Sequence, residues 1–335
     1  MSTVYAVRTC VQMPVKFKLH HYQPVGNGLV SNYPLCLRGQ DGALYARRWP
    51  RFRRVVRRKG KKPMTVCAGF VHREGVLLCA DTQHEGWDIK LHAAKMRHFD
   101  CPSGRVGLTY AGNANFATAV GQKLEREVKA LSKGADLLLA IEKIIDKEYR
   151  RLVYRNPHPD DPAIDYGFLM AIQPRNGTTK LYLADRVAVM NVPTYKLIGI
   201  GETFGAQLVE PGFTLGADPE QMLVLAVYAM ALVKEHVPGC GGLSMYLDLR
   251  NDGSYLEYYG EPLLERLEKW VGVYHLLTWN LLNQFADRTM SEADFIRNLE
   301  EFGHKLVQAR RNFDDDKKLI EMRREAMRMI TQGKI

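Results

Sequence analysis

The sequence predicts an α+β fold in which β-sheets are covered by helices. Short apolar runs rich in β-forming residues occur in three blocks, helices lie in pairs between the blocks, and the C-terminal tail is helical throughout. This order is typical of layered sheets with helices on their faces. It differs from a doubly wound nucleotide-binding fold, and the sequence contains neither a GxGxxG nor a Walker-type phosphate loop.

The first block contains two strand pairs. Residues 65–71 and 75–80 are apolar runs joined by a short segment ending at Gly75, which is typical of a hairpin. Residues 95–99 and 105–111 form the second pair. Apolar residues then recur every four positions from Phe116 to Val128, which predicts an amphipathic helix.

The remaining elements follow from the same signals. A second helix is predicted over about 135–154, and His158 in the Pro-rich segment after it is interpreted as a solvated loop residue. Further elements are expected as strands at 166–173, 180–185 and 195–199, helices at 202–210 and 218–236, and a strand pair at 243–249 and 254–259. The tail is predicted to be helical from 262, with Ser291 and Asp294 as a cap.

Charge divides the chain. Residues 1–64 carry 14 Lys and Arg and a single acid, Asp41, for a net charge of +13, whereas the rest of the chain has a net charge of −3. We therefore predict three segments: a basic, poorly structured arm (1–64), a domain over 65–262, and a helical extension over 263–335. Nucleic acid is not expected as a partner, because the basic charge belongs to the arm.

Several interpretations of the arm stay open. It is compatible with a nucleic-acid arm, a membrane-surface arm, a transit peptide, a cleaved leader, or an upstream stretch absent from the working protein because translation starts at Met64. The chain has no apolar run long enough for a transmembrane helix, so no membrane partner is expected. Its six Cys show no disulfide or metal-binding spacing, which favours a reducing, cytoplasmic location without a metal or other cofactor.

Several motifs together resemble a known family. Thr65-Val-Cys-Ala-Gly-Phe70 is followed sixteen residues after Thr65 by Asp81, at the end of Gly75-Val-Leu-Leu-Cys-Ala-Asp81. Lys95, the turn at 110–114, a Gly-rich segment at 199–205 and Cys240-Gly-Gly242 come next in order. With this order and spacing, residues 65–260 resemble a proteasome β-type subunit, an N-terminal-nucleophile (Ntn) hydrolase, and more closely the bacterial proteasome-like proteins outside the core particle.

The resemblance implies a four-layer αββα sandwich and a threonine-type peptidase. Thr65 would be the nucleophile, Lys95 and Asp81 its charged partners, and the Gly112 amide the oxyanion donor. Further implied roles fall to Cys240 and Gly241 as supporting residues and to Asn113 and Ala114 as substrate-binding residues. The partners considered are a peptide or protein substrate, further copies of the chain in a closed or open ring, and a regulatory partner.

The sequence also departs from the family pattern. Ile200, Val237 and Cys240 stand where the family often has Ser, Asp and Ser, and Met64 stands where self-processing subunits have Gly. Removal of an initiator Met is then a simpler route to a free Thr65 than autolysis. The alternative interpretation is a catalytically silent, proteasome-like structural subunit that acts through assembly and partner binding, with Asp81 and Lys95 as a structural ion pair.

Overall fold

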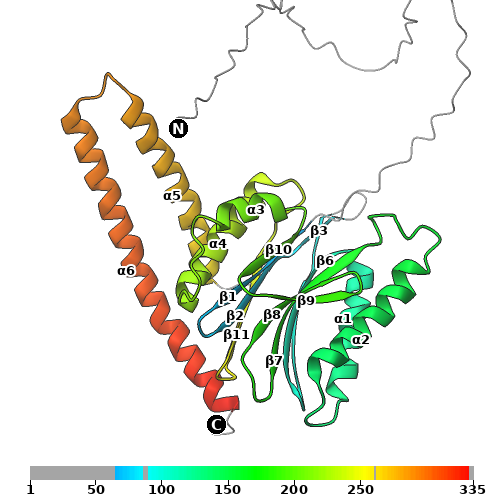
Figure 1. Cartoon of the computed structure of the whole chain (residues 1–335). Helices are drawn as coiled ribbons and strands as arrows, with labels where there is room; N and C mark the ends of the chain where they lie inside the picture. The colour runs from blue at the N-terminus through cyan, green and yellow to red at the C-terminus, as the bar shows by residue number, and fades with distance from the viewer. Residues whose placement is uncertain (1–64, 86–89, 260–261, 332–335) are drawn as a thin grey trace, which may run out of the picture. The chain divides into compact units, whose positions relative to one another are not determined.

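The computed structural model describes residues 65–85, 90–259 and 262–331, all of which belong to one compact unit. The predicted arm over 1–64 lies outside the described residues. Figure 1 shows the two sheets and the helices around them.

The first sheet contains the strands that carry the Thr65 motif. Five strands pair in the order β10-β1-β2-β11-β12, and every neighbouring pair is antiparallel. Their bounds are β1 Val66–His72, β2 Gly75–Asp81, β10 Tyr195–Gly199, β11 Ser244–Arg250 and β12 Tyr255–Tyr259. The predicted hairpin of β1 and β2 is confirmed, and in its register His72 lies opposite Gly75. This register brings the start of β1 next to the end of β2.

The second sheet is a meander of five antiparallel strands in chain order. Its strands are β5 Met96–Cys101, β6 Gly104–Gly112, β7 Tyr166–Pro174, β8 Lys180–Asp185 and β9 Ala188–Val192. A separate short pair, β3 Gln83–Glu85 and β4 Lys90–His92, lies between β2 and β5 in the chain. The sequence analysis did not predict β3, β4 or β9.

Two helices follow β6. They are α1, Ala114–Lys129, and α2, Leu137–Tyr149, which continues as a π-helical turn over Arg150–Tyr154. Both α-helices begin with a side-chain cap, Asn113 accepting from the Phe116 amide and Asp136 accepting from the Leu139 amide, both at 3.0 Å. The caps satisfy amides that the first helical turn leaves without a partner. The second predicted helix, 135–154, is thus confirmed with a π-helical end.

Four helices belong to the later part of the chain. They are α3 Glu202–Val209, α4 Pro219–His236, α5 Pro262–Ala286 and α6 Glu292–Thr331. The predicted cap of α6 is confirmed, since the Ser291 hydroxyl accepts from the Asp294 amide at 3.1 Å. No helix among the described residues is long and apolar enough to cross a membrane.

Buried apolar residues form three clusters. One joins the first sheet to α3, α4 and the start of α5, through residues such as Phe70, Met230 and Leu264. A second joins the other sheet to α1 and α2. The third contains residues from both sheets, including Leu78 and Leu169. Cys67 on β1 and Cys79 on β2 are fully buried in these clusters.

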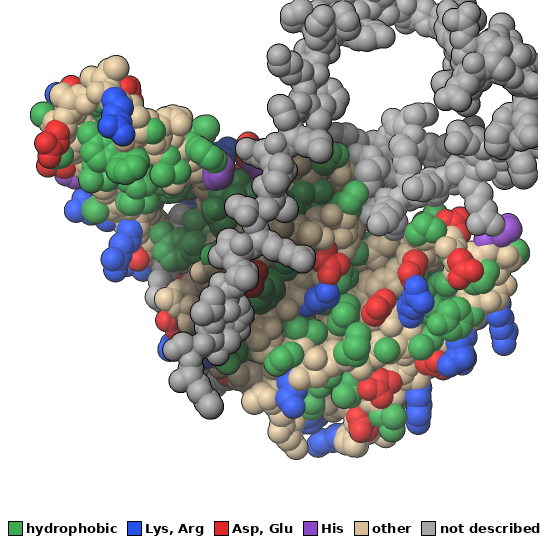
Figure 2. Space-filling view, turned by 45° about the horizontal axis from the view of Figure 1, so that its top comes forward, with side chains coloured by type: hydrophobic (Ala, Val, Ile, Leu, Met, Phe, Trp, Pro, Cys, Tyr) green, Lys and Arg blue, Asp and Glu red, His purple; other side chains and the backbone are tan. Residues whose placement is uncertain are grey.

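The hairpin of α5 and α6 exposes several large apolar side chains. On α5 these include Leu276 (65% exposed), Trp279 (55%), Leu282 (54%) and Phe285 (78%). Figure 2 shows hydrophobic side chains gathered at the outer end of this hairpin. Isolated exposed apolar residues are ordinary, but a contiguous group of this kind is typical of an interaction surface.

Asp248 on β11 lies in a buried ion network. Its carboxylate accepts from Arg250 Nε at 2.7 Å and contacts His72 Nε2 at 3.0 Å, and all three residues are at most 5% exposed. Burial alone raises the pKa of Asp248, but the hydrogen bond from His72 and the charge of Arg250 outweigh it, so its pKa lies below 3.8. A carboxylate with a lowered pKa stabilises the fold above its unfolded-state pKa, and that contribution is lost as the pH falls through the folded-state pKa.

We predict that Asp248→Asn lowers the free energy of unfolding at pH 7 by about 3 kcal/mol, because it removes the buried carboxylate from Arg250 and leaves the buried guanidinium paired only with the partly exposed Glu74. The difference from the unmodified chain should begin to shrink as the pH falls below about 3.9, the ordinary Asp pKa, and should vanish only below the lowered folded-state pKa, where Asp248 itself becomes protonated. Urea unfolding at pH 7 and pH 3.5 measures both effects. Asp146→Asn, which removes an exposed pair with Arg150, is the matched control and should cost less than about 0.5 kcal/mol. Equal costs for the two variants would contradict the prediction.

Candidate functional site

Thr65, Asp81 and Lys95 lie in contact at the end of the first sheet. The Thr65 Oγ1 hydroxyl donates to Asp81 Oδ1 at 2.6 Å. Lys95 Nζ donates to the same Asp81 oxygen at 2.6 Å and also to Thr65 Oγ1. The exposed fractions are 4% for Thr65, 0% for Asp81 and 1% for Lys95. The structure therefore brings together the three residues that the sequence analysis chose as nucleophile and charged partners.

The β1–β2 register explains how Asp81 reaches Thr65. Cys67 lies opposite Ala80, so the residues just beyond this pair, Val66 and Asp81, are neighbours at the sheet end. Asp81 Oδ1 accepts from the Val66 amide at 3.2 Å, and Oδ2 accepts from the Gly241 amide at 3.0 Å. The carboxylate is thus held by two backbone donors as well as by the two side chains.

Lys95 precedes β5 and carries its ammonium group into this buried site. Its third acceptor is the Gln83 carbonyl oxygen, at 2.5 Å. An ammonium has three N–H donors, and each of them has an acceptor here. Because a buried charge without partners is strongly unfavourable, these contacts fix the position of Nζ beside the Thr65 hydroxyl.

Glycines allow the backbone around Thr65 to pack closely. Gly199 is opposite Val66 across the β1–β10 pair and has a φ of +96°. A Cβ atom at Gly199 would lie 2.3 Å from the Thr65 carbonyl oxygen. The Gly201 amide donates to the same oxygen at 3.5 Å. Only glycine fits position 199, for both the backbone conformation and the contact.

The segment Cys240–Gly242 forms another wall. A Cβ at Gly241 would lie 2.2 Å from Gln83 Oε1, and the Gln83 amide donates to the Gly241 carbonyl at 3.1 Å. Cys240 is 5% exposed and packs in the cluster of α3 and α4. Burial, with a smaller effect from the Asp81 charge, raises the pKa of the Cys240 thiol to about 12. Cys240 is therefore a buried, protonated thiol close to the site, and its supporting role stays a prediction.

Gly112 lines the pocket next to the candidate site, whereas its neighbours Asn113 and Ala114 do not. Gly112 ends β6 with a φ of +107°. Asn113, predicted as substrate-binding, uses its side chain to cap α1 and donates to the Ala163 carbonyl at 2.9 Å. Asn113 and Ala114 are not lining residues of the pocket that Gly112 lines. Both assignments as substrate-binding residues stay predictions.

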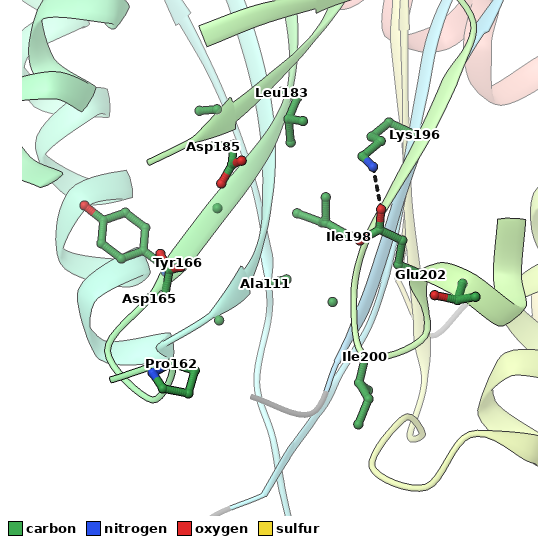
Figure 3. Close-up of a pocket in the computed structure, with 15 residues that line it drawn as sticks. Ala111, Pro162, Asp165, Tyr166, Leu183, Asp185, Lys196, Ile198, Ile200 and Glu202 are labelled. Carbon is green, nitrogen blue, oxygen red and sulfur yellow. Dashed lines mark hydrogen bonds and ion pairs between the residues drawn. The ribbon is translucent and has the colours of Figure 1, made fainter. Parts of the chain in front are cut away.

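A pocket of about 560 Å³ lies between the ends of the two sheets (Figure 3). Gly112 and Tyr166 line it from the second sheet, and Ile198, Gly199 and Ile200 line it from the β10 side. Gly199 is the link between the pocket and Thr65, because it contacts both. Ile200, one of the departures from the family pattern, is 39% exposed. Val237, the other aliphatic departure, packs against the helical cluster.

Sequence reasoning missed the charged residues of this pocket. Asp165, Asp185, Lys196 and Glu202 line it, yet they come from three strand ends and a helix start that only the folded chain brings together. The residues that the structure describes contain no group of three or more His, Cys, Asp or Glu that could hold a metal ion.

We predict that Gly199→Ala destabilises the fold more than Gly134→Ala does. Both glycines have a positive φ, but a Cβ at Gly134 would meet nothing within 4 Å. The Gly134 variant should lower the free energy of unfolding by about 1–2 kcal/mol through backbone strain. The Gly199 variant should lower it by about 2 kcal/mol more, because its methyl group meets Thr65. Urea denaturation compares the two. Equal costs would show that the Gly199–Thr65 contact relaxes without penalty.

Comparison with solved structures agrees with the fold. An Anbu (ancestral beta-subunit) structure from Yersinia bercovieri has a TM-score of 0.56 at 15% identity, over 67% of this chain and 97% of that one. A Gly-1 mutant of Anbu from Hyphomicrobium sp. strain MC1 has a TM-score of 0.55 at 11% identity, over 65% and 99%. A helical assembly of the Anbu complex from Pseudomonas aeruginosa has a TM-score of 0.52 at 14% identity, over 64% and 96%.

The sequence itself matches no protein-family model and no curated protein at a significant level. The identities to the Anbu structures are low, so the likeness is one of fold. The described part of this chain therefore has an α+β fold with two antiparallel sheets, similar to that of the proteasome-like Anbu structures.

Proposed function

We propose that this chain is a threonine-type Ntn hydrolase that cleaves peptide amides, built as a four-layer αββα sandwich. The observation that carries the proposal is the Thr65 hydroxyl, which is hydrogen-bonded to both the Asp81 carboxylate and the Lys95 ammonium. The three apolar clusters support the four layers. The proteasome-like fold of the Anbu structures supports the reaction class by analogy.

The proposed reaction uses Thr65 as both nucleophile and base. A Thr hydroxyl is a weak nucleophile near neutral pH and needs an adjacent base, which the free amine of an N-terminal Thr supplies. Such an amine ordinarily titrates near pH 7.7–8.0, and the Lys95 charge beside it favours the neutral, basic form. Asp81 holds Lys95 charged and in place.

The bond changes follow from these roles. Thr65 Oγ1 attacks the substrate carbonyl carbon as its proton moves to the Thr65 amine, and the Gly112 amide stabilises the oxyanion. Breakdown expels the product amine, which takes up that proton, and leaves an ester on Oγ1. Water then attacks the ester, with the Thr65 amine again as base, and releases the acid product.

The reaction requires that the bond between Met64 and Thr65 be absent. In the 335-residue chain this bond makes the Thr65 nitrogen an amide, which is no base. A working enzyme then begins at Thr65, by removal of the arm or of an initiator Met.

The second candidate function is a catalytically silent structural subunit. It is favoured by the burial of Thr65, which is 4% exposed, and by aliphatic side chains at Ile200 and Val237. Under this interpretation the contacts among Thr65, Asp81 and Lys95 only stabilise the end of the first sheet.

The decisive experiment joins intact-mass measurement to hydrolysis of a fluorogenic peptide library. We expect the active species to begin at Thr65. In that species Thr65→Ala should lower kcat on the order of a thousandfold or more, whereas Thr65→Ser, which keeps a hydroxyl nucleophile, should retain measurable activity.

Circular dichroism is the control that tests whether each of these variants is folded. An active chain that still carries Met64, or a Thr65→Ala variant as active as the parent, would exclude Thr65 as the nucleophile. A chain that begins at Thr65, is folded and cleaves no peptide would favour the silent subunit.

The proposal includes a homo-oligomer. The exposed apolar side chains at the end of the α5–α6 hairpin support it (Figure 2), as does the helical assembly described for the Anbu complex of Pseudomonas aeruginosa. A second copy of this chain would bury these side chains, a favourable change of about 25 cal/mol per Å² of apolar surface. Peptide substrate and any regulatory protein are the other partners considered.

We predict that the double variant Leu282→Glu/Phe285→Glu sediments as a smaller species than the unmodified chain, because two charges would enter the apolar interface. Sedimentation velocity measures the difference. Leu215→Glu, at a 71%-exposed position between α3 and α4, is the matched control and should leave the assembly unchanged. Identical sedimentation of the double variant and the unmodified chain would remove the hairpin from the interface.

A further inference from the structure

The pocket between the sheet ends lies next to the candidate nucleophile, separated from it by Gly199. Gly199 lines the pocket, and its Cα lies so close to Thr65 that an added Cβ would be 3.1 Å from Thr65 Cγ2. Gly112, the proposed oxyanion donor, lines it from the other side. A peptide whose carbonyl lay between Thr65 and Gly112 would therefore direct a neighbouring side chain into this pocket. The pocket volume of about 560 Å³ falls within the range of about 300–1,000 Å³ that is usual for ligand sites.

The lining of the pocket carries an excess of negative charge. Among its described lining residues, three are carboxylates, Asp165, Asp185 and Glu202, and one is a cation, Lys196. Lys196 Nζ is hydrogen-bonded to Glu202, so this pair is internally neutralised on the β10 side. Figure 3 shows the pair on one wall and Asp185 on the opposite wall, at the end of β8. Asp165 and Asp185 are left as two carboxylates without a cation in the lining.

Asp165 is held as an acceptor at the base of this wall. Its Oδ1 accepts from Tyr149 Oη at 2.6 Å and from the Tyr166 amide at 2.9 Å. Burial, together with the Asp165 carboxylate, raises the pKa of Tyr149 well above its ordinary value. Tyr149 consequently keeps its proton and remains a donor to Asp165, which fixes the orientation of the carboxylate.

Asp185 is the more accessible of the two carboxylates. It is an exposed residue at the last position of β8, and the turn that follows contains Arg186 with a φ of +56°. Arg186 is exposed and does not line the pocket. An incoming cation would therefore meet Asp185 first and Asp165 deeper in.

We propose that this pocket binds an ammonium or guanidinium group, the side chain of a Lys or Arg in the peptide substrate. Apolar side chains of Ile198 and Leu183 line the pocket beside the carboxylates, which suits the aliphatic stem of Lys or Arg below its charged end. The proposal rests on the proposed peptidase function for its substrate, but the binding of the cationic group is independent of turnover.

The test measures binding in the full-length chain carrying Thr65→Ala, so that no hydrolysis occurs. Fluorescence anisotropy compares three labelled peptides that differ at one position, with Lys, norleucine or Glu. We expect the Lys peptide to bind about tenfold more tightly than the norleucine peptide, since a partly buried charge pair contributes about this much. In Asp185→Asn the Lys preference should fall to threefold or less, and Asp185→Lys should reverse it in favour of the Glu peptide.

Two controls make the test specific. Asp146→Asn is the same chemical change at an exposed site on α2 and should leave the Lys preference intact, which separates the pocket from the general charge of the chain. Spermidine and lysine amide, added as competitors, distinguish a peptide side chain from a free amine, because a peptide site should release the labelled peptide only at far higher concentrations of the free amines.

The outcomes separate this inference from the proposed function. Equal affinity for the Lys and norleucine peptides, or a Lys preference that survives in Asp185→Asn, overturns the inference even if the chain hydrolyses peptides. A Lys preference lost in Asp185→Asn supports it, even if the chain beginning at Thr65 cleaves nothing. Displacement by micromolar spermidine would assign the pocket to a free polyamine and overturn the peptide assignment.

Discussion

The buried ammonium group of Lys95 is the interaction on which the candidate site depends. It needs three acceptors, and two segments provide them: the Thr65 hydroxyl lies before β1, and the Asp81 carboxylate and the Gln83 carbonyl lie at the end of β2 and just after it. Removing any one acceptor leaves a buried charge partly unpaired, which is strongly unfavourable. The two sheets are therefore tied together at this end by a charge as well as by apolar packing, and the Thr65 hydroxyl is oriented before any substrate arrives.

Close backbone packing makes these contacts geometrically feasible. Gly199 and Gly241 lie where any side chain would meet Thr65 or Gln83 at less than van der Waals distance. The segments at 199–201 and 240–242 thus reach the sheet end because they lack side chains there. Gly199 also lines the charged pocket, so one glycine packs against Thr65 on one side and borders the pocket on the other.

Sequence reasoning predicted the parts of this architecture that depend on local pattern. The hairpin of β1 and β2, the four-residue period of α1 and the cap at Ser291 are local signals, and each is confirmed. Three strands were not predicted: β3, β4 and β9. The first two have three residues each, and β9 is a largely exposed edge strand, so none of them shows a clear alternation of apolar and polar residues. Asn113 was assigned to substrate binding through the family resemblance, and that assignment stays a prediction; the cap that its side chain forms on α1 was not foreseen.

The charged pocket could not be predicted, because Asp165 and Asp185 belong to no motif and the segment 199–205, which contains Glu202, was chosen for its glycines. The topology of the second sheet brings Asp165 and Asp185 together, because β6 and β8 end at the same end of the sheet at which β7 begins. That end of the second sheet faces the end of β10 at Gly199 across the pocket. Thr65, Asp81 and Lys95 are also distant in the sequence, but their spacing resembles that of a known family, and this resemblance replaced the missing three-dimensional information.

A single peptide bond separates the two candidate functions. The contacts of Thr65 with Asp81 and Lys95 are already formed in the chain that still carries Met64, so they serve stability whether or not the protein is an enzyme. Loss of that bond adds one new group, the Thr65 amine, beside an ammonium that favours its neutral form. The fold and the ion pair are shared by both functions, and therefore neither can distinguish them. The chemical state of the Thr65 nitrogen is the property that does.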